Sequence, residues 1–78
     1  MSSPIDVPIR DASIRLGQLL KLAGVVDDGA MAREVIERGL VAVDGEVDTR
    51  RGRQVRPGDV VTYEGETLRV TTDAARSR

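Results

Sequence analysis

The densest group of chemically active side chains lies in the stretch DTRRGRQVRPGD, residues 48–59. Four of the chain's eleven arginines stand there within seven residues, with no acid between them: Arg50, Arg51, Arg53 and Arg56. A guanidinium group is planar, always charged, and matches the geometry of phosphate oxygens. The segment therefore predicts contact with phosphates or with another anionic surface. Asp48, two residues before Arg50, is the nearest acid that could neutralise it.

The charge of the whole chain conceals this cluster. The 78 residues carry a formal net charge of -1, yet outside residues 50–56 there are eight basic and thirteen acidic side chains. The distribution of charge therefore says more about the partner than the net charge does. A solvated loop is the alternative explanation for such a cluster, and the sequence leaves it open.

Composition argues against several kinds of chemistry. There is no cysteine and no histidine, which removes disulfides, zinc–thiolate sites and the commonest general base. Asp27 and Asp28 are interpreted as a helix N-terminus, not as metal ligands. We expect no enzyme activity, no metal and no cofactor. Tyr63 is the only aromatic residue, so a nucleic-acid partner would be bound through phosphates, sugars and shape, which favours structured RNA over stacked single strands.

Two helices must position these side chains. In SIRLGQLLKLAG an apolar stripe at helical spacing predicts the first helix, with Gly24 after its end: Ile14, Leu16, Leu19, Leu20 and Ala23. Asp28 is a good N-cap for a second helix that ends at Gly39. Its predicted buried face is Ala32, Val35 and Ile36.

Polar side chains on the outer face of the second helix stand four residues apart. This spacing allows two ion pairs, Arg33 with Glu37 and Glu34 with Arg38. Lys21, on the first helix, is predicted to face either solvent or a ligand.

Short strands and tight turns fill the rest of the chain. Turns are predicted at Asp44-Gly45, Pro57-Gly58 and Glu64-Gly65, each next to an apolar strand segment. The expected fold class is α+β, with two helices packed on a small, mainly antiparallel, bent sheet. Residues 1–12 are interpreted as an N-terminal lead-in with a short strand, residues 13–71 as the domain, and residues 72–78 as a flexible tail.

Four separated motifs in the correct order resemble the S-four RNA-binding domain family, also called the αL motif. They are RL..LLKLAG, A..VI..G.V.V.G, TRRGR and V.PGD.V, and they span about residues 14–61. The resemblance is to the small, single-domain bacterial members. Where members usually have Asp, this chain has Gly17, so its first helix is expected to begin late or to fray.

The resemblance implies an RNA-binding face built from the two helices and the following hairpin. Carried over position by position, the RNA-binding residues would be Arg15, Lys21, Arg33, Arg50, Arg51 and Arg53, while Arg56 flanks the turn. It implies a protein that binds folded RNA, ribosomal RNA among others, through backbone phosphates. From its own sequence, which has no apolar run of membrane-spanning length, the chain is expected to be cytoplasmic and monomeric, with no membrane partner. Two alternatives stay open: a module, ribosome-associated or not, that docks its arginines on an acidic protein surface, and an accessory domain that serves a separate catalytic subunit.

Overall fold

The computed structural model describes residues 4–50 and 52–73. Arg51 and residues 74–78, which make up most of the predicted tail, therefore lie outside the described residues. The elements in chain order are β1 (Ile5–Ile9), β2 (Ile14–Arg15), α1 (Leu16–Leu22), α2 (Gly29–Glu37), β3 (Val41–Val43), β4 (Glu46–Val47), β5 (Gln54–Val55), β6 (Val60–Tyr63) and β7 (Glu66–Thr72). No helix in this part of the chain has the length and apolar character needed to cross a membrane.

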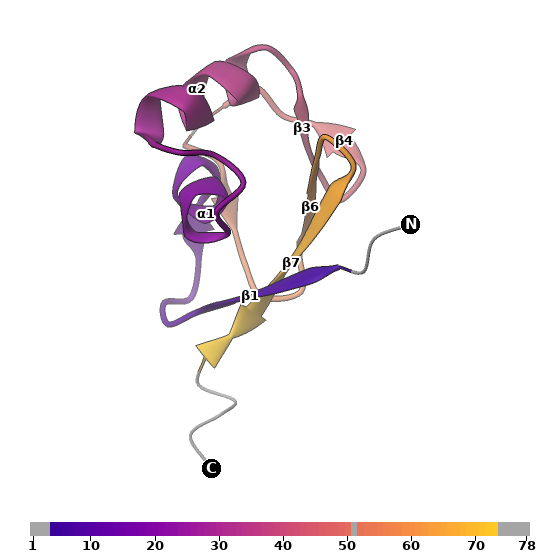
Figure 1. Ribbon diagram of the computed structural model, residues 1–78. Helices are drawn as coiled ribbons and strands as arrows, with labels where there is room; N and C mark the ends of the chain where they lie inside the picture. The colour runs from indigo at the N-terminus through magenta and orange to yellow at the C-terminus, as the bar shows by residue number, and fades with distance from the viewer. Residues whose placement is uncertain (1–3, 51, 74–78) are drawn as a thin grey trace.

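Five of the strands form one mixed sheet. Their order is β1-β7-β6-β3-β4, with β1 parallel to β7 and every other pair antiparallel. Strands β2 and β5 form a separate antiparallel ladder. Figure 1 shows the two helices together on one side, with the strands of the sheet beside them. The predicted α+β class, two helices with a mainly antiparallel sheet, is confirmed.

The core lies between the helices and the inner face of this sheet. Strand residues alternate between core and solvent, as the period of two requires: Val7 and Ile9 of β1 point inward, and so do Leu68 and Val70 of β7. Tyr63 is buried beside them. The helices contribute the predicted inward faces, namely Leu16, Leu19, Leu20, Ala32, Val35 and Ile36.

The first helix begins later than its apolar stripe suggests. Ile14 is not helical, because it pairs with Val55 in the β2–β5 ladder. The Leu16 N–H, at the first helical residue, donates to the Arg53 carbonyl at 2.8 Å. The helix start is thus tied to the arginine segment, and Gly24, at φ +78°, follows its end as predicted.

The second helix follows its prediction closely. Asp28 is the N-cap, and its side chain accepts a hydrogen bond from the Met31 N–H at 2.9 Å. Gly39 stands just after the last turn with φ +79°. On the outer face the Glu34–Arg38 ion pair is present at 2.8 Å. Arg33, by contrast, has no acidic partner among the described residues, so of the two ion pairs that the spacing allows only Glu34–Arg38 is present.

The three predicted turns are all present. Asp44 and Gly45 both have positive φ, as a type I′ hairpin turn requires, and so do Glu64 and Gly65. At the third turn Gly58 has φ +100°, and the Asp59 N–H donates to the Arg56 carbonyl at 2.9 Å. These turns set the strand register and so fix where the arginine segment leaves the sheet.

Candidate nucleic-acid interface

A hollow of about 440 Å³ lies between the helices and the loop that follows β4. Three of the predicted RNA-binding residues, which come from separate places in the sequence, line it together: Arg15, Lys21 and Arg33. The remaining lining residues are Gly17, Gln18, Gly29, Ala32 and Gly52. The fold therefore gathers three cations and three glycines around one hollow.

The packing of each helix decides which side chains reach this hollow. In α1, Leu16, Leu19 and Leu20 are fully buried, so the opposite face carries the polar residues. Gln18 and Lys21 stand three residues apart within α1, a spacing that places side chains on one helix face, and Arg15 is the extended residue that precedes the helix. In α2, Ala32 and Val35 turn inward and leave Arg33 exposed.

The cations of the hollow differ from most other cations of the protein because no acidic side chain forms an ion pair with them among the described residues. Each of the other described arginines outside residues 50–56 forms an ion pair: Arg10 with Asp73, Arg38 with Glu34, and Arg69 with Asp6. Within residues 4–50 and 52–73, no acid pairs with any of the three hollow cations. Among the described residues, Arg56 is the one other cation whose side chain forms no ion pair. Three of the four unpaired cations thus meet at one place.

The glycines give a ligand room to approach the backbone. A methyl group placed on Gly29 or Gly52 would meet nothing within 4 Å. Gly29 is also the first residue of α2, where N–H groups have no partner inside the helix and the helix dipole favours an anion. Since Asp28 takes the Met31 N–H, the N–H groups of Gly29 and Ala30 are left for a ligand.

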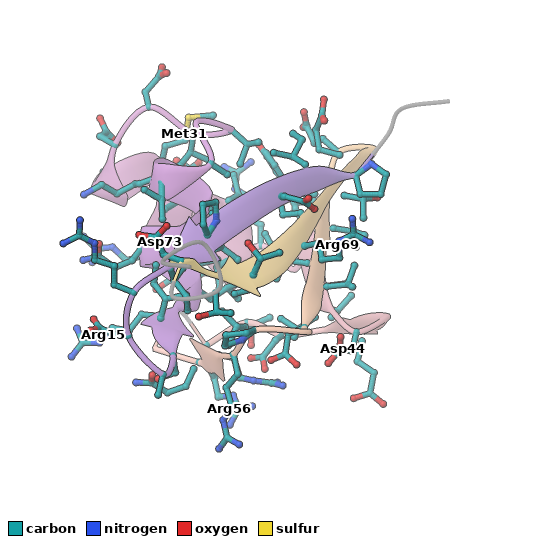
Figure 2. All side chains as sticks on the ribbon, turned by 90° about the horizontal axis from the view of Figure 1, so that it is seen from below. Arg15, Met31, Asp44, Arg56, Arg69 and Asp73 are labelled. Atoms are coloured by element: carbon teal, nitrogen blue, oxygen red, sulfur yellow. The ribbon has the colours of Figure 1, made fainter. Side chains whose placement is uncertain are left out.

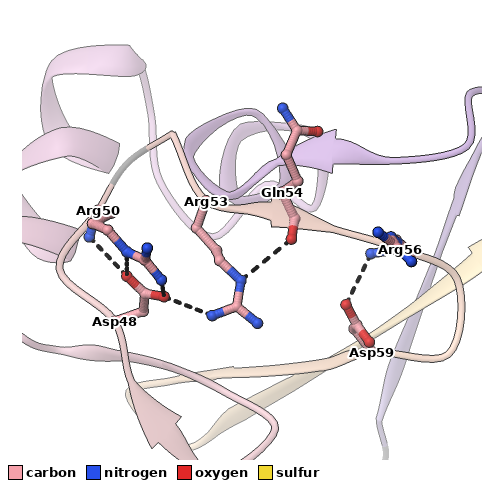
Figure 3. A network of polar contacts seen from close by, with 6 residues as sticks. All are labelled: Asp48, Arg50, Arg53, Gln54, Arg56 and Asp59. Atoms are coloured by element: carbon pink, nitrogen blue, oxygen red, sulfur yellow. Dashed lines mark hydrogen bonds and ion pairs between the residues drawn. The ribbon is translucent and has the colours of Figure 1, made fainter.

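The arginine segment itself is held by a buried acid. Asp48 exposes only 7 % of its side chain, and its carboxylate accepts hydrogen bonds from Arg50 and Arg53 (Figure 3). Arg50 donates to it from its backbone N–H at 2.9 Å, from Nε at 3.0 Å and from Nη2 at 2.9 Å. Arg53 adds a bond from Nη1 at 2.7 Å. One carboxylate therefore offsets one of two adjacent positive charges.

These contacts explain the electrostatics of the segment. The side-chain hydrogen bond from Arg50 lowers the pKa of Asp48 far below its ordinary range, and the Arg50 backbone N–H adds to this effect. The same side-chain hydrogen bond raises the pKa of Arg50. Arg50 nonetheless leaves 73 % of its side chain exposed, against 34 % for Arg53. Arg50 can thus contact Asp48 and an external anion together.

The network also fixes the loop that forms one wall of the hollow. The Arg53 N–H donates to the Arg50 carbonyl at 3.1 Å, and the Arg53 carbonyl receives the Leu16 N–H. Gly52 lies between these two anchored residues. Sequence reasoning named Asp48 only as the nearest acid, and it missed Gln18 and Gly52. No pattern in the sequence distinguished them.

The remaining predicted positions are placed as follows. Arg51 lies outside the described residues. The Arg56 N–H donates to Asp59 Oδ2 at 2.9 Å, which makes Arg56 part of the turn, as its position suggested. No cluster of three or more potential metal ligands occurs in the described ranges. The site therefore offers donors and positive charge.

The fold and this face define a small α+β domain with a basic, glycine-lined helical surface. The family description "S4 domain" matches residues 7–71. The chain belongs to the S4 domain family, the S-four family that its motifs resemble. The solution structure of YbcJ from E. coli, described as revealing an αL motif involved in RNA binding, superposes with a TM-score of 0.71, 33% identity and 92% of each chain covered.

Curated relatives agree with this assignment. A protein of Bacillus subtilis named "Probable ribosome maturation protein RlbA" is 45% identical over 65 residues, which are 83% of this chain and 89% of the relative. The "Putative RNA-binding protein YbcJ" of Escherichia coli is 39% identical over 57 residues, 73% of this chain and 81% of the relative. A Tyrosine--tRNA ligase of Burkholderia lata is 37% identical over 65 residues, only 16% of its length.

Proposed function

We propose that this protein is a non-enzymatic module that binds folded RNA through backbone phosphates. The observation that carries the proposal is the meeting of Arg15, Lys21 and Arg33, without acidic partners, around one hollow. Unpaired cations that converge on a concave surface attract a polyanion and release its counterions when it binds. Arginine suits this role because its fork donates to two phosphate oxygens together.

The backbone of the hollow supports the same ligand. Gly17, Gly29 and Gly52 put no side chain between the protein backbone and an approaching phosphate. The start of α2 adds N–H donors at a point where negative charge is favoured. With a single aromatic residue in the chain, the protein has no stacking platform, so recognition depends on phosphates, sugars and shape.

The arginine segment supplies the second part of the proposed interface. Asp48 orients Arg50 and Arg53, and a well-exposed Arg50 retains donors for an outside anion. Arg51 remains in the proposal on the strength of the family motif alone. The segment acts next to the hollow because Gly52, within it, lines the hollow wall.

Ribosomal RNA is the class of RNA that we propose as ligand. The support is the name of the Bacillus relative, which connects a similar chain to ribosome maturation. Structured RNA also fits a site that reads backbone geometry, because a folded RNA presents phosphates at fixed spacing. The protein would then act as a monomer that associates with ribosomal particles by binding their RNA.

Crosslinking in cells, followed by sequencing of the bound RNA, tests this function. We expect folded ribosomal segments to be enriched, and we expect Arg33→Gln to lower their recovery. Arg69→Gln is the matched control, because Arg69 is paired with Asp6 and lies on the opposite side from Arg15 in Figure 2. Recovery of protein partners that survive nuclease treatment, with no RNA enriched, would instead favour docking on an acidic protein.

A further inference from the structure

Gln18 differs from every other side chain that lines the hollow. Arg15, Lys21 and Arg33 can only donate hydrogen bonds, and the other lining residues are glycine or alanine. The Gln18 amide both donates and accepts. It is the only side-chain acceptor among the described residues of the hollow.

This difference matters because a phosphate group only accepts hydrogen bonds. Donor-only cations therefore bind the phosphates of RNA and of DNA alike. The ribose 2′-hydroxyl is both donor and acceptor, and it is the group that distinguishes RNA from DNA at a given position. A protein acceptor within reach of the sugar can detect its O–H, whereas a cation cannot.

The position of Gln18 places that acceptor between two phosphate-binding groups. Arg15 is the extended residue just before α1, Lys21 lies in the last turn of α1, and Gln18 stands three residues from each in the sequence, with all three lining the same hollow. A ribose lies between any two successive phosphates of a strand. A strand held by Arg15 and Lys21 would therefore turn a sugar toward Gln18.

The surroundings leave the Gln18 amide available. Its side chain is exposed, and within the part of the chain that the structure describes it has no hydrogen-bond partner. On its other side Gln18 borders a second hollow, where Asp11 offsets the charge of Arg15, the one cation that lines it, so this hollow attracts a phosphate less than the first does. Gln54 in that hollow already accepts a hydrogen bond from Ser13 at 2.6 Å. A strand would therefore pass on the side of Lys21 and Arg33.

We propose that Gln18 is the residue by which this protein recognises the ribose 2′-hydroxyl and so selects RNA over DNA. The inference rests on the proposed RNA-binding function and adds to it the chemical group, the 2′-hydroxyl, that the protein recognises. Gln18 contributes a neutral hydrogen bond beside charged ones, so its loss changes selectivity more than it changes the salt dependence of binding.

The test compares one stem–loop in two chemical forms, as ordinary RNA and with 2′-fluoro riboses. Fluorine keeps the A-form sugar pucker but removes the O–H donor, so the two forms have the same shape and charge. We expect wild-type protein to bind the ordinary RNA about two- to tenfold more tightly, the value of one hydrogen bond. In Gln18→Ala that ratio should fall to about one, while circular dichroism stays unchanged because alanine favours a helix.

A second variant separates recognition from charge. Gln18→Lys removes the acceptor and adds a cation, so it should bind both stem–loops more tightly than wild type and still show a ratio near one. A wild-type ratio of one, or a ratio that persists in both variants, overturns the inference while RNA binding itself stands. If the wild-type protein binds neither stem–loop, the proposed function fails and the inference fails with it.

Discussion

At the scale of single residues, Asp48 is the most consequential side chain that is not itself a proposed RNA contact. It is nearly buried, it accepts four hydrogen bonds from two arginines, and it anchors the loop that carries Gly52. A buried carboxylate is stable only when its charge and lone pairs are satisfied. The arginine segment is therefore partly structural, and the Asp48 carboxylate offsets part of its positive charge.

The pH dependence of stability should reveal this role. The pKa of Asp48 is lower in the folded protein than in the unfolded chain, where it is near the ordinary value of 3.8. The unfolded state therefore binds more protons in acid, and the free energy of unfolding falls as pH drops below about 5. We expect Asp48→Asn to lower this free energy by about 1–2 kcal/mol at pH 7.

Urea denaturation of both proteins between pH 7 and acid pH checks this expectation. The deficit of Asp48→Asn should shrink as pH falls, because the wild-type carboxylate progressively loses its advantage over the neutral amide. A deficit of constant size over the whole range would contradict the contribution assigned to the Asp48 charge.

At the scale of elements, the start of α2 combines a stabilising cap with a ligand-facing surface. Asp28 accepts a hydrogen bond from the Met31 N–H, and the Gly29 N–H remains available at the hollow. Helix α1 is tied to the arginine loop through Leu16 and Arg53. The two helices and the loop are thus held in one arrangement before any ligand binds, which reduces the entropic cost of binding.

Removal of the cap should weaken the protein measurably. We expect Asp28→Ala to lower the free energy of unfolding by about 1 kcal/mol, the typical value of an N-cap. Asp27→Ala is the matched control, since Asp27 is an exposed neighbour with the same charge and makes no described hydrogen bond. Chemical denaturation of both variants measures the difference, and equal losses would show that charge near the helix start, not the cap, is responsible.

Strand β1 shows that the lead-in contributes to the core. Its parallel pairing with β7 places Val7 and Ile9 against the helices. We expect Ile9→Ala to cost about 2–4 kcal/mol, the usual range for a buried isoleucine. Ile5→Ala in the same strand should cost far less, because Ile5 is 36% exposed. Thermal or urea unfolding compares the two, and similar losses would contradict the assignment of β1 to the core.

At the scale of the whole molecule, sequence patterns predicted the features that depend on residues close together in the chain. The N-cap Asp28 and the Gly-containing turns follow from local backbone preferences, and the inward faces follow from periodicity. Ile14 was misassigned because its pairing with Val55 joins residues far apart in the sequence. The parallel β1–β7 pair is another long-range contact that no local pattern encodes.

The candidate site was predictable in its residue types but not in its grouping. Arg15, Lys21 and Arg33 were identified by position in a family motif, while their meeting at one hollow depends on how α1 packs against α2. The pairing of Arg50 and Arg53 with Asp48 likewise depends on loop geometry. Only the structure separates cations with acidic partners from those without them.

The salt dependence of RNA binding tests the central claim most directly. Two triple variants lower the net charge equally: Arg15→Gln/Lys21→Gln/Arg33→Gln removes the hollow cations, and Arg10→Gln/Arg38→Gln/Arg69→Gln removes cations that are paired with acids. Affinity for a stem–loop RNA is measured across a salt series.

We expect the hollow variant to bind more weakly and its slope of log K against log salt to become shallower by about 2–3, close to one per lost phosphate contact. The control variant should keep nearly the wild-type slope. Equal changes in the two variants would contradict the assignment of the hollow as the RNA-binding site.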